Sequence, residues 1–120
     1  MLKKYNIKNV MKDKIYISGA INSIGLEKAT VLFNNAEKYL LSLGYDVINP
    51  LNLCQEKNIT WADCMLEDIK YLFQCSHIYV LSNWRVSTGA RIEVGIAQEL
   101  GMTIIYEEGS LFDTNVILNN

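Results

Sequence analysis

The sequence predicts an α/β domain of the flavodoxin-like or Rossmann-like three-layer class, built on a parallel sheet of about four strands. Short β-branched and aromatic segments alternate along the chain with longer segments of helical apolar periodicity. The strand-like segments are apolar without clear polar alternation, which is typical of parallel strands covered on both faces. Right-handed crossover connections then favour the strand order 2-1-3-4.

The predicted elements have recognisable ends. In chain order, we expect strand 14–18, helix 26–42, strand 45–48, a connection at 51–58, helix 61–74, strand 77–81, helix 88–100 and strand 103–106. Thr60 and Ser87 are good N-caps for the second and third helices. Gly44 and Gly101 end the first and third helices, and Pro50 stops the second strand.

Length and composition fit one domain spanning 1–120, with its core at about 14–107. A formal net charge of −2 argues against binding to duplex nucleic acid or to an anionic membrane. No apolar segment has the length of a membrane span, and the polar N-terminus lacks a signal-peptide region. We therefore expect a cytoplasmic protein, in which the apolar residues 116–118 pack on a partner subunit.

The cysteine and histidine content argues against a metal site. Cys54, Cys64 and Cys75 form no C-x-x-C pair, and an odd number suits buried thiols in a reducing cytosol. His77 is the only histidine and falls inside a predicted strand, so we expect no metal. The phosphate-binding motifs G-x-x-x-x-G-K-[ST] and G-x-G-x-x-G are also absent, and we expect no cofactor.

The strand order predicts where a ligand binds. In open parallel sheets, ligands bind beyond the carboxyl ends of the strands, where the strand order reverses. That point lies between the first and third strands, so the loops 18–25 and 82–89 are expected to form the pocket.

Glu93 is the most informative residue at this place. At 100° per residue, it falls in the middle of the apolar face of helix 88–100. A carboxylate on such a face is costly unless it is paired or used. Gly89, Gly95 and Ala97 leave room beside it, which favours a nucleophile or base in a cleft. The alternative is a buried carboxylate bound by an arginine or by backbone amides.

Asp68 is the second candidate acid. It lies on the rim of the apolar face of helix 61–74, apart from the other acidic residues of that helix. Either it acts in the pocket, or it is a rim residue that caps a neighbouring loop.

Hydrogen-bond donors gather in the two loops. They are Ser18, Gly19, Asn22 and Ser23 in the first loop, and Ser87, Thr88 and Gly89 in the second. The free amides at the start of the third helix form an anion site, flanked by Arg85 and Arg91. The alternative is simple helix capping by Ser87.

Two aromatic residues lie close to the predicted pocket. Tyr16 is in the first strand and Trp84 precedes the third helix. An aromatic ring at a pocket mouth stacks on a nucleobase. Core packing for Tyr16 and loop anchoring for Trp84 are the alternatives.

The ordered set of segments resembles the nucleoside 2-deoxyribosyltransferase-like superfamily, and in particular its small phage-borne and bacterial members. The matching segments are 15–19 (IYISG), 44–50 (GYDVINP), 68–69 (DI) and 87–93 (STGARIE), followed by Ala97 and Gly101. The resemblance covers about 14–107. It implies a flavodoxin-like fold, cleavage of the N-glycosidic bond of nucleosides or nucleotides, and a homodimer or higher homo-oligomer.

The resemblance also implies roles for single residues. Glu93 would be the nucleophile, Asp68 would assist proton transfer or hold the sugar, and Tyr16 would lie near the nucleophile. The turns at Gly19 and at Ser87–Gly89 would hold the sugar or its 5′ group. The substrate-binding set is then Ser18, Gly19, Asn22, Trp84, Ser87, Gly89 and Arg91.

Ser87 bears on the substrate. The transferases usually carry an aspartate at this position, whereas the nucleoside-monophosphate N-glycosidases of the superfamily carry a serine. A neutral residue at an anion-binding helix start favours a 5′-monophosphate substrate, and with it hydrolysis. The chemistry of the residues agrees, because two carboxyl groups in different settings divide nucleophile and acid roles in glycosidic cleavage.

We therefore expect an enzyme that cleaves an N-glycosidic bond by hydrolysis or deoxyribosyl transfer. The alternative is a non-catalytic nucleotide-binding module or sensor of the same fold, in which Glu93 only grips a ribose. A response-regulator-like domain is disfavoured, because Ser18-Gly19 stands where such a domain needs an acidic cluster.

Overall fold

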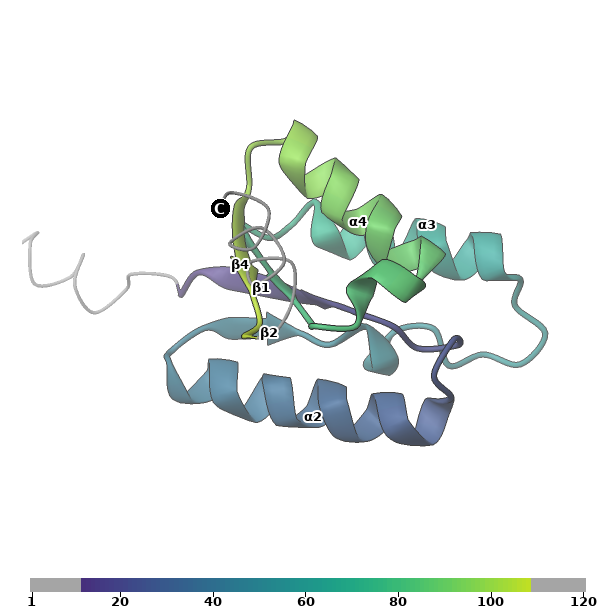
Figure 1. The fold of residues 1–120 in the computed structure, drawn as a ribbon. Helices are drawn as coiled ribbons and strands as arrows, with labels where there is room; N and C mark the ends of the chain where they lie inside the picture. Colours follow the sequence, from purple (N-terminus) through teal and green to yellow (C-terminus); the bar gives the residue numbers. More distant parts are fainter. Residues whose placement is uncertain (1–11, 109–120) are drawn as a thin grey trace, which may run out of the picture.

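The computed structural model describes residues 12–108, which form parallel strands connected by helices (Figure 1). The elements are β1 (Lys14–Ser18), α2 (Leu26–Ser42), β2 (Asp46–Ile48), the 3-10 turn η1 (Pro50–Asn52), α3 (Trp61–Leu72), β3 (His77–Val80), the 3-10 turn η2 (Trp84–Val86), α4 (Thr88–Glu99) and β4 (Thr103–Tyr106). The segment 116–118, predicted to pack on a partner, lies outside the described residues.

The sheet has the order β2-β1-β3-β4 with every pairing parallel, which confirms the predicted fold class. Figure 1 shows α2 on one face of the sheet and α3 with α4 on the other, so the fold has three layers. Element ends differ from the predicted ones by at most two residues, as is usual at frayed ends. No helix within residues 12–108 combines the length and apolarity needed to cross a membrane.

The alternation of side chains along β1 divides the core into two layers. Ile15 and Ile17 pack with Phe33 in the cluster under α2. Tyr16 belongs to the cluster on the opposite face, together with residues of α4. Because side chains in a strand alternate with a period of two, Ser18 points to the same side as Tyr16. This places two hydroxyl groups of β1 below α4.

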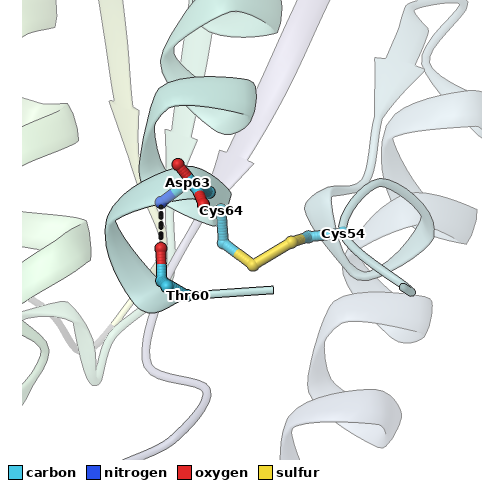
Figure 2. The surroundings of a disulfide bond; sticks show 4 residues. All are labelled: Cys54, Thr60, Asp63 and Cys64. Atoms are coloured by element: carbon cyan, nitrogen blue, oxygen red, sulfur yellow. Dashed lines mark hydrogen bonds between the residues drawn. A yellow bond between two sulfur atoms is a disulfide. The ribbon is translucent and has the colours of Figure 1, made fainter. Parts of the chain in front are cut away.

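The expectation of three buried thiols is wrong for two of the cysteines. Cys54, just after η1, forms a disulfide with Cys64 in the first turn of α3, with the Cα atoms 5.6 Å apart (Figure 2). The chain reverses between them, and Thr60 begins α3 by accepting a hydrogen bond from the Asp63 amide at 3.1 Å. Their spacing alone does not reveal this reversal. Cys75 is a buried free thiol, as expected.

Gly19, directly after β1, has no room for a side chain. A Cβ atom there would lie 2.6 Å from Leu81 Cδ1 and 2.9 Å from Leu81 Cβ. We predict that Gly19→Ala lowers the free energy of unfolding by about 1–3 kcal/mol, measured by urea denaturation. Gly95→Ala is the matched control, since a Cβ there meets nothing within 4 Å. It should raise stability by about 0.5–1 kcal/mol; equal effects of both changes would contradict the prediction.

Candidate active site

A cavity of about 950 Å³ opens at the carboxyl ends of β1 and β3, in the size range of small-molecule sites. Four parts of the chain line it: the loop after β1, the first half of α2, the segment from η1 to the second turn of α3, and the start of α4. The two loops at the strand ends are joined, because the Ala20 amide donates to Asn83 Oδ1 at 2.9 Å. This hydrogen bond holds both rims of the cavity in one arrangement.

Glu93 lies in the second turn of α4 and lines the cavity although only 4 % of its surface is exposed. Tyr16 Oη donates to its Oε2 at 2.8 Å, and Ser18 Oγ donates to its Oε1 at 2.7 Å. Each carboxylate oxygen therefore has one hydroxyl donor from β1. The alternative interpretation of Glu93 required an arginine or backbone amides as partners of its carboxylate. The structure places two side-chain hydroxyls there instead.

The environment of Glu93 works in two directions. Burial is the main cause that raises the pKa of Glu93 to about 8, because it penalises the ionised form. The hydrogen bonds from Ser18 and Tyr16 oppose this rise, and the negative charge of Asp68 adds to it. The carboxylate is thus held in a single orientation by donors, yet it stays basic.

Tyr16 contacts Glu93 but does not line the cavity. Its side chain is fully buried. Burial, followed by the nearby charge of Glu93, raises its pKa well above the ordinary value of 10.0. The hydroxyl therefore keeps its proton and remains a donor to Glu93. Ser18 is fully buried as well and lies behind Glu93, outside the cavity lining.

Asp68 lines the cavity from the second turn of α3. Its Oδ1 is buried and has no hydrogen-bond partner among residues 12–108. Burial, with a smaller contribution from Glu67, raises its pKa to about 7. No described residue makes a hydrogen bond to the Asp68 side chain, so the loop-capping alternative has no contact to support it. A carboxyl group that is half protonated near neutral pH is suited to give and take a proton.

The start of α4 forms another wall. Ser87 Oγ accepts from the Ala90 amide at 3.1 Å and so caps the helix. Ser87, Thr88 and Gly89 line the cavity, whereas Arg91 does not. Arg91 folds back along the exposed side, where its Nε donates to the Ser87 carbonyl and its Nη2 to Thr88 Oγ1. The capping interpretation of Ser87 is therefore correct, and it leaves the first amides of the helix at the cavity.

The remaining candidates are divided between the cavity and the core. Gly19, Asn22 and Ser23 line the cavity. Trp84 does not; its ring centroid lies 6.2 Å from that of Tyr106, and Arg85 lies over its face at 5.6 Å. Of the small residues of α4 singled out in the sequence, Gly89 lines the cavity, while Gly95 and Ala97 do not.

Three cavity residues of α3 are not among the residues predicted for the site, namely Trp61, Cys64 and Met65. Trp61 and Met65 line the cavity beside Asp68. Both lie near Asp68 on the helical wheel, Trp61 two turns before it and Met65 one turn before, so spacing offered a signal. Met65 approaches the opposite wall, since a Cβ at Gly89 would lie 3.0 Å from its Sδ.

The fold and site define an α/β domain with two carboxyl groups of raised pKa at one cavity, beyond the carboxyl ends of its strands. Residues 13–106 match the model of the family described as Domain of unknown function (DUF4406), and the chain belongs to this family. No curated protein matches the chain.

The pKa of Glu93 predicts how stability depends on pH. Its pKa is about 8 in the folded protein against an ordinary value of 4.5, so the free energy of unfolding falls as pH rises from about 4.5 to 8. We predict that Glu93→Gln, which carries no charge, raises the free energy of unfolding by about 2–4 kcal/mol at pH 8. The gain should shrink toward pH 5. Denaturant titrations at several pH values measure it.

Glu99→Gln is the control, because Glu99 is an exposed carboxylate near the end of the same helix. It should leave stability unchanged within about 0.5 kcal/mol at each pH. A gain for Glu93→Gln that is the same at pH 5 and pH 8 would contradict the buried-carboxyl argument.

Proposed function

We propose that this protein is an N-glycosidase that cleaves the bond between base and sugar in a nucleoside 5′-monophosphate, as the resemblance to the nucleoside 2-deoxyribosyltransferase-like superfamily suggests. One observation carries the proposal. The buried Glu93 carboxylate, held by hydroxyl donors at both oxygens, shares a cavity with Asp68, whose buried Oδ1 has no partner within residues 12–108.

Glu93 supplies the nucleophile of the proposed reaction. One carboxylate oxygen attacks the anomeric carbon as the carbon–nitrogen bond to the base breaks, giving a glycosyl ester on Glu93. The transition state resembles an oxocarbenium ion, which an adjacent carboxylate stabilises. Tyr16 and Ser18 fix the direction of the attacking group, so little reorganisation is needed during the step.

Asp68 supplies the proton that the departing base requires. In its protonated form it donates to a ring nitrogen of the base, and the base leaves neutral. The resulting Asp68 carboxylate then takes a proton from water as the water oxygen attacks the anomeric carbon. This step releases the sugar with retained configuration and restores both carboxyl groups. A second base in place of water would give transfer instead of hydrolysis.

The start of α4 is the proposed site for the 5′-phosphate. The amides of Thr88 and Gly89 have no hydrogen-bond partner among the described residues, and both residues line the cavity. Free amides at a helix N-terminus favour an anion, and a neutral Ser87 cap does not compete with it for negative charge.

The proposal includes a cytoplasmic location, where nucleotides are abundant, and a homo-oligomer. Large apolar side chains are exposed on the helices that flank the cavity, among them Leu66 on α3 and Ile92 on α4. Such side chains offer a surface on which a second copy can pack.

The first prediction of this proposal concerns base release. We expect the purified protein to liberate free base from at least one nucleoside 5′-monophosphate in a panel that also contains the nucleosides, with release followed by chromatography. Glu93→Ala should abolish release, because the nucleophile is lost. Asp68→Asn should slow it about 10²- to 10⁴-fold, because proton transfer is lost.

Lys38→Ala, an exposed change on α2 away from the cavity, is the control and should release base at the wild-type rate. Nucleotides that raise the melting temperature without any base release would favour the binding module instead. Equal release by wild type and Glu93→Ala would also reject the proposal.

The second prediction concerns pH. The reactive form needs Glu93 ionised and Asp68 protonated, with pKa values of about 8 and 7. The rate should therefore fall below about pH 7, where Glu93 is increasingly protonated, and above about pH 8, where Asp68 is increasingly ionised. A pH profile of kcat/KM measures this.

Ser18→Ala isolates the contribution of one donor. Without the Ser18 hydroxyl the pKa of Glu93 rises further, so kcat/KM near pH 7 should fall about tenfold and the alkaline limb should move to higher pH. Ser42→Ala removes a hydroxyl at the far end of α2 and should leave the profile unchanged. An unshifted alkaline limb in Ser18→Ala would show that Ser18 is only a packing residue.

A further inference from the structure

The cavity wall between β2 and α3 includes an irregular segment, residues 53–60. Residues 53–60 form no helix or strand, and Gln55, Glu56, Lys57 and Asn58 are exposed. The Gln55 amide donates to the Leu53 carbonyl, and Gln55 Nε2 donates to the Leu51 carbonyl at 3.1 Å. These hydrogen bonds stay within the segment or reach η1, so they do not join the segment to α3.

The disulfide between Cys54 and Cys64 joins the start of the segment to the first turn of α3 (Figure 2). Within the described part of the chain, no hydrogen bond joins residues 56–59 to another element. Both half-cystines are partly buried and line the cavity, so the disulfide belongs to the cavity wall and not to the closed core.

The disulfide is also connected to the proposed chemistry through α3. Cys64 and Asp68 are four residues apart and therefore share a face of the helix, which is the face that lines the cavity. Trp61, half exposed in the same first turn, also lines the cavity. A change in the bond therefore acts on the helix that carries Asp68.

We propose that Cys54 and Cys64 form a reversible redox site that controls the cavity. In the disulfide form, the bond holds residues 53–60 against α3 as a wall of the cavity. In the dithiol form, the segment moves away from α3 and the cavity opens. This inference goes beyond the proposed function, because it concerns the structure of the wall and is measured without substrate.

The exchange balances with a dithiol as reductant. A thiolate of the dithiol attacks one cysteine sulfur, the Cys54–Cys64 bond breaks, and the other cysteine leaves as a thiolate that takes up a proton. The second thiol of the reductant then displaces the first cysteine, and the reductant becomes a cyclic disulfide. Two electrons pass to the protein. A small-molecule disulfide such as oxidised glutathione reverses the reaction.

Cys75 stands outside this exchange. It is buried in the core under α4, and burial raises its pKa to about 11, which leaves little reactive thiolate near neutral pH. The site therefore consists of one pair without a competing thiol. In the cytoplasmic location proposed above, such a pair exchanges with the thiol pool rather than serving as a permanent staple.

Trp61 provides the readout. The chain has two tryptophans, and Trp84 packs against Tyr106 away from the cavity, so Trp84→Phe leaves Trp61 as the only indole. We expect a dithiol to change the emission of Trp61 in this variant and oxidised glutathione to restore it. In the wild-type protein, reduction should speed tryptic cleavage after Lys57 at least tenfold. It should also lower the melting temperature by about 10 °C.

The variants sharpen the test. The double variant Cys54→Ser/Cys64→Ser should show the fast cleavage of the reduced protein and no response to dithiol, whereas Cys75→Ala should respond like the wild type. Thiol alkylation in denaturant, followed by mass spectrometry, should find one modified cysteine after treatment with oxidised glutathione and three after treatment with a dithiol. Three modified cysteines after oxidised glutathione, or Trp61 emission and cleavage after Lys57 that ignore reduction, would overturn the proposal. Neither readout depends on base release, so this failure is distinct from failure of the glycosidase proposal.

Discussion

The burial of one carboxyl group under β1 is the constraint on which the rest of the structure depends. Glu93 is nearly inaccessible, and its oxygens are held by hydroxyls two residues apart on a single strand. For this to happen, α4 must cross the sheet with its second turn over Tyr16 and Ser18. The cap at Ser87 and the turn η2 set the start of α4, and so fix its register on the sheet. This arrangement lowers the stability of the folded protein, because burial raises the pKa of Glu93 and ionising it there costs free energy.

The fold and the position of Glu93 follow from local patterns in the sequence. The strands are short apolar segments between glycine, proline and capping residues, and these signals act within a few residues of each other. With helices on both faces, right-handed crossovers require the strand order to reverse once, and the sheet does so between β1 and β3. Helical periodicity alone placed Glu93 on the buried face of α4, because that face is set by the spacing of its apolar neighbours.

The contacts of the site depend on how distant elements pack, and the sequence does not contain them in local form. The partners of Glu93 lie 77 and 75 residues away along the chain, so only the register of α4 on β1 reveals them. Trp84 was predicted to bind substrate from its position next to α4, yet the structure turns its ring toward Tyr106. The Cys54–Cys64 pair depends on the reversal of an irregular segment, which apolar periodicity does not describe.

The two acids of the site are therefore supported by different physics. Glu93 is fixed by the sheet and by core packing, which change only if the domain unfolds. Asp68 lies on a helix whose first turn is joined to an irregular wall by one covalent bond. The proposed reaction needs both groups at a constant separation, because attack and proton donation occur on the same substrate. Redox control of the wall would then act mainly on proton transfer and substrate retention, while the nucleophile would remain in place.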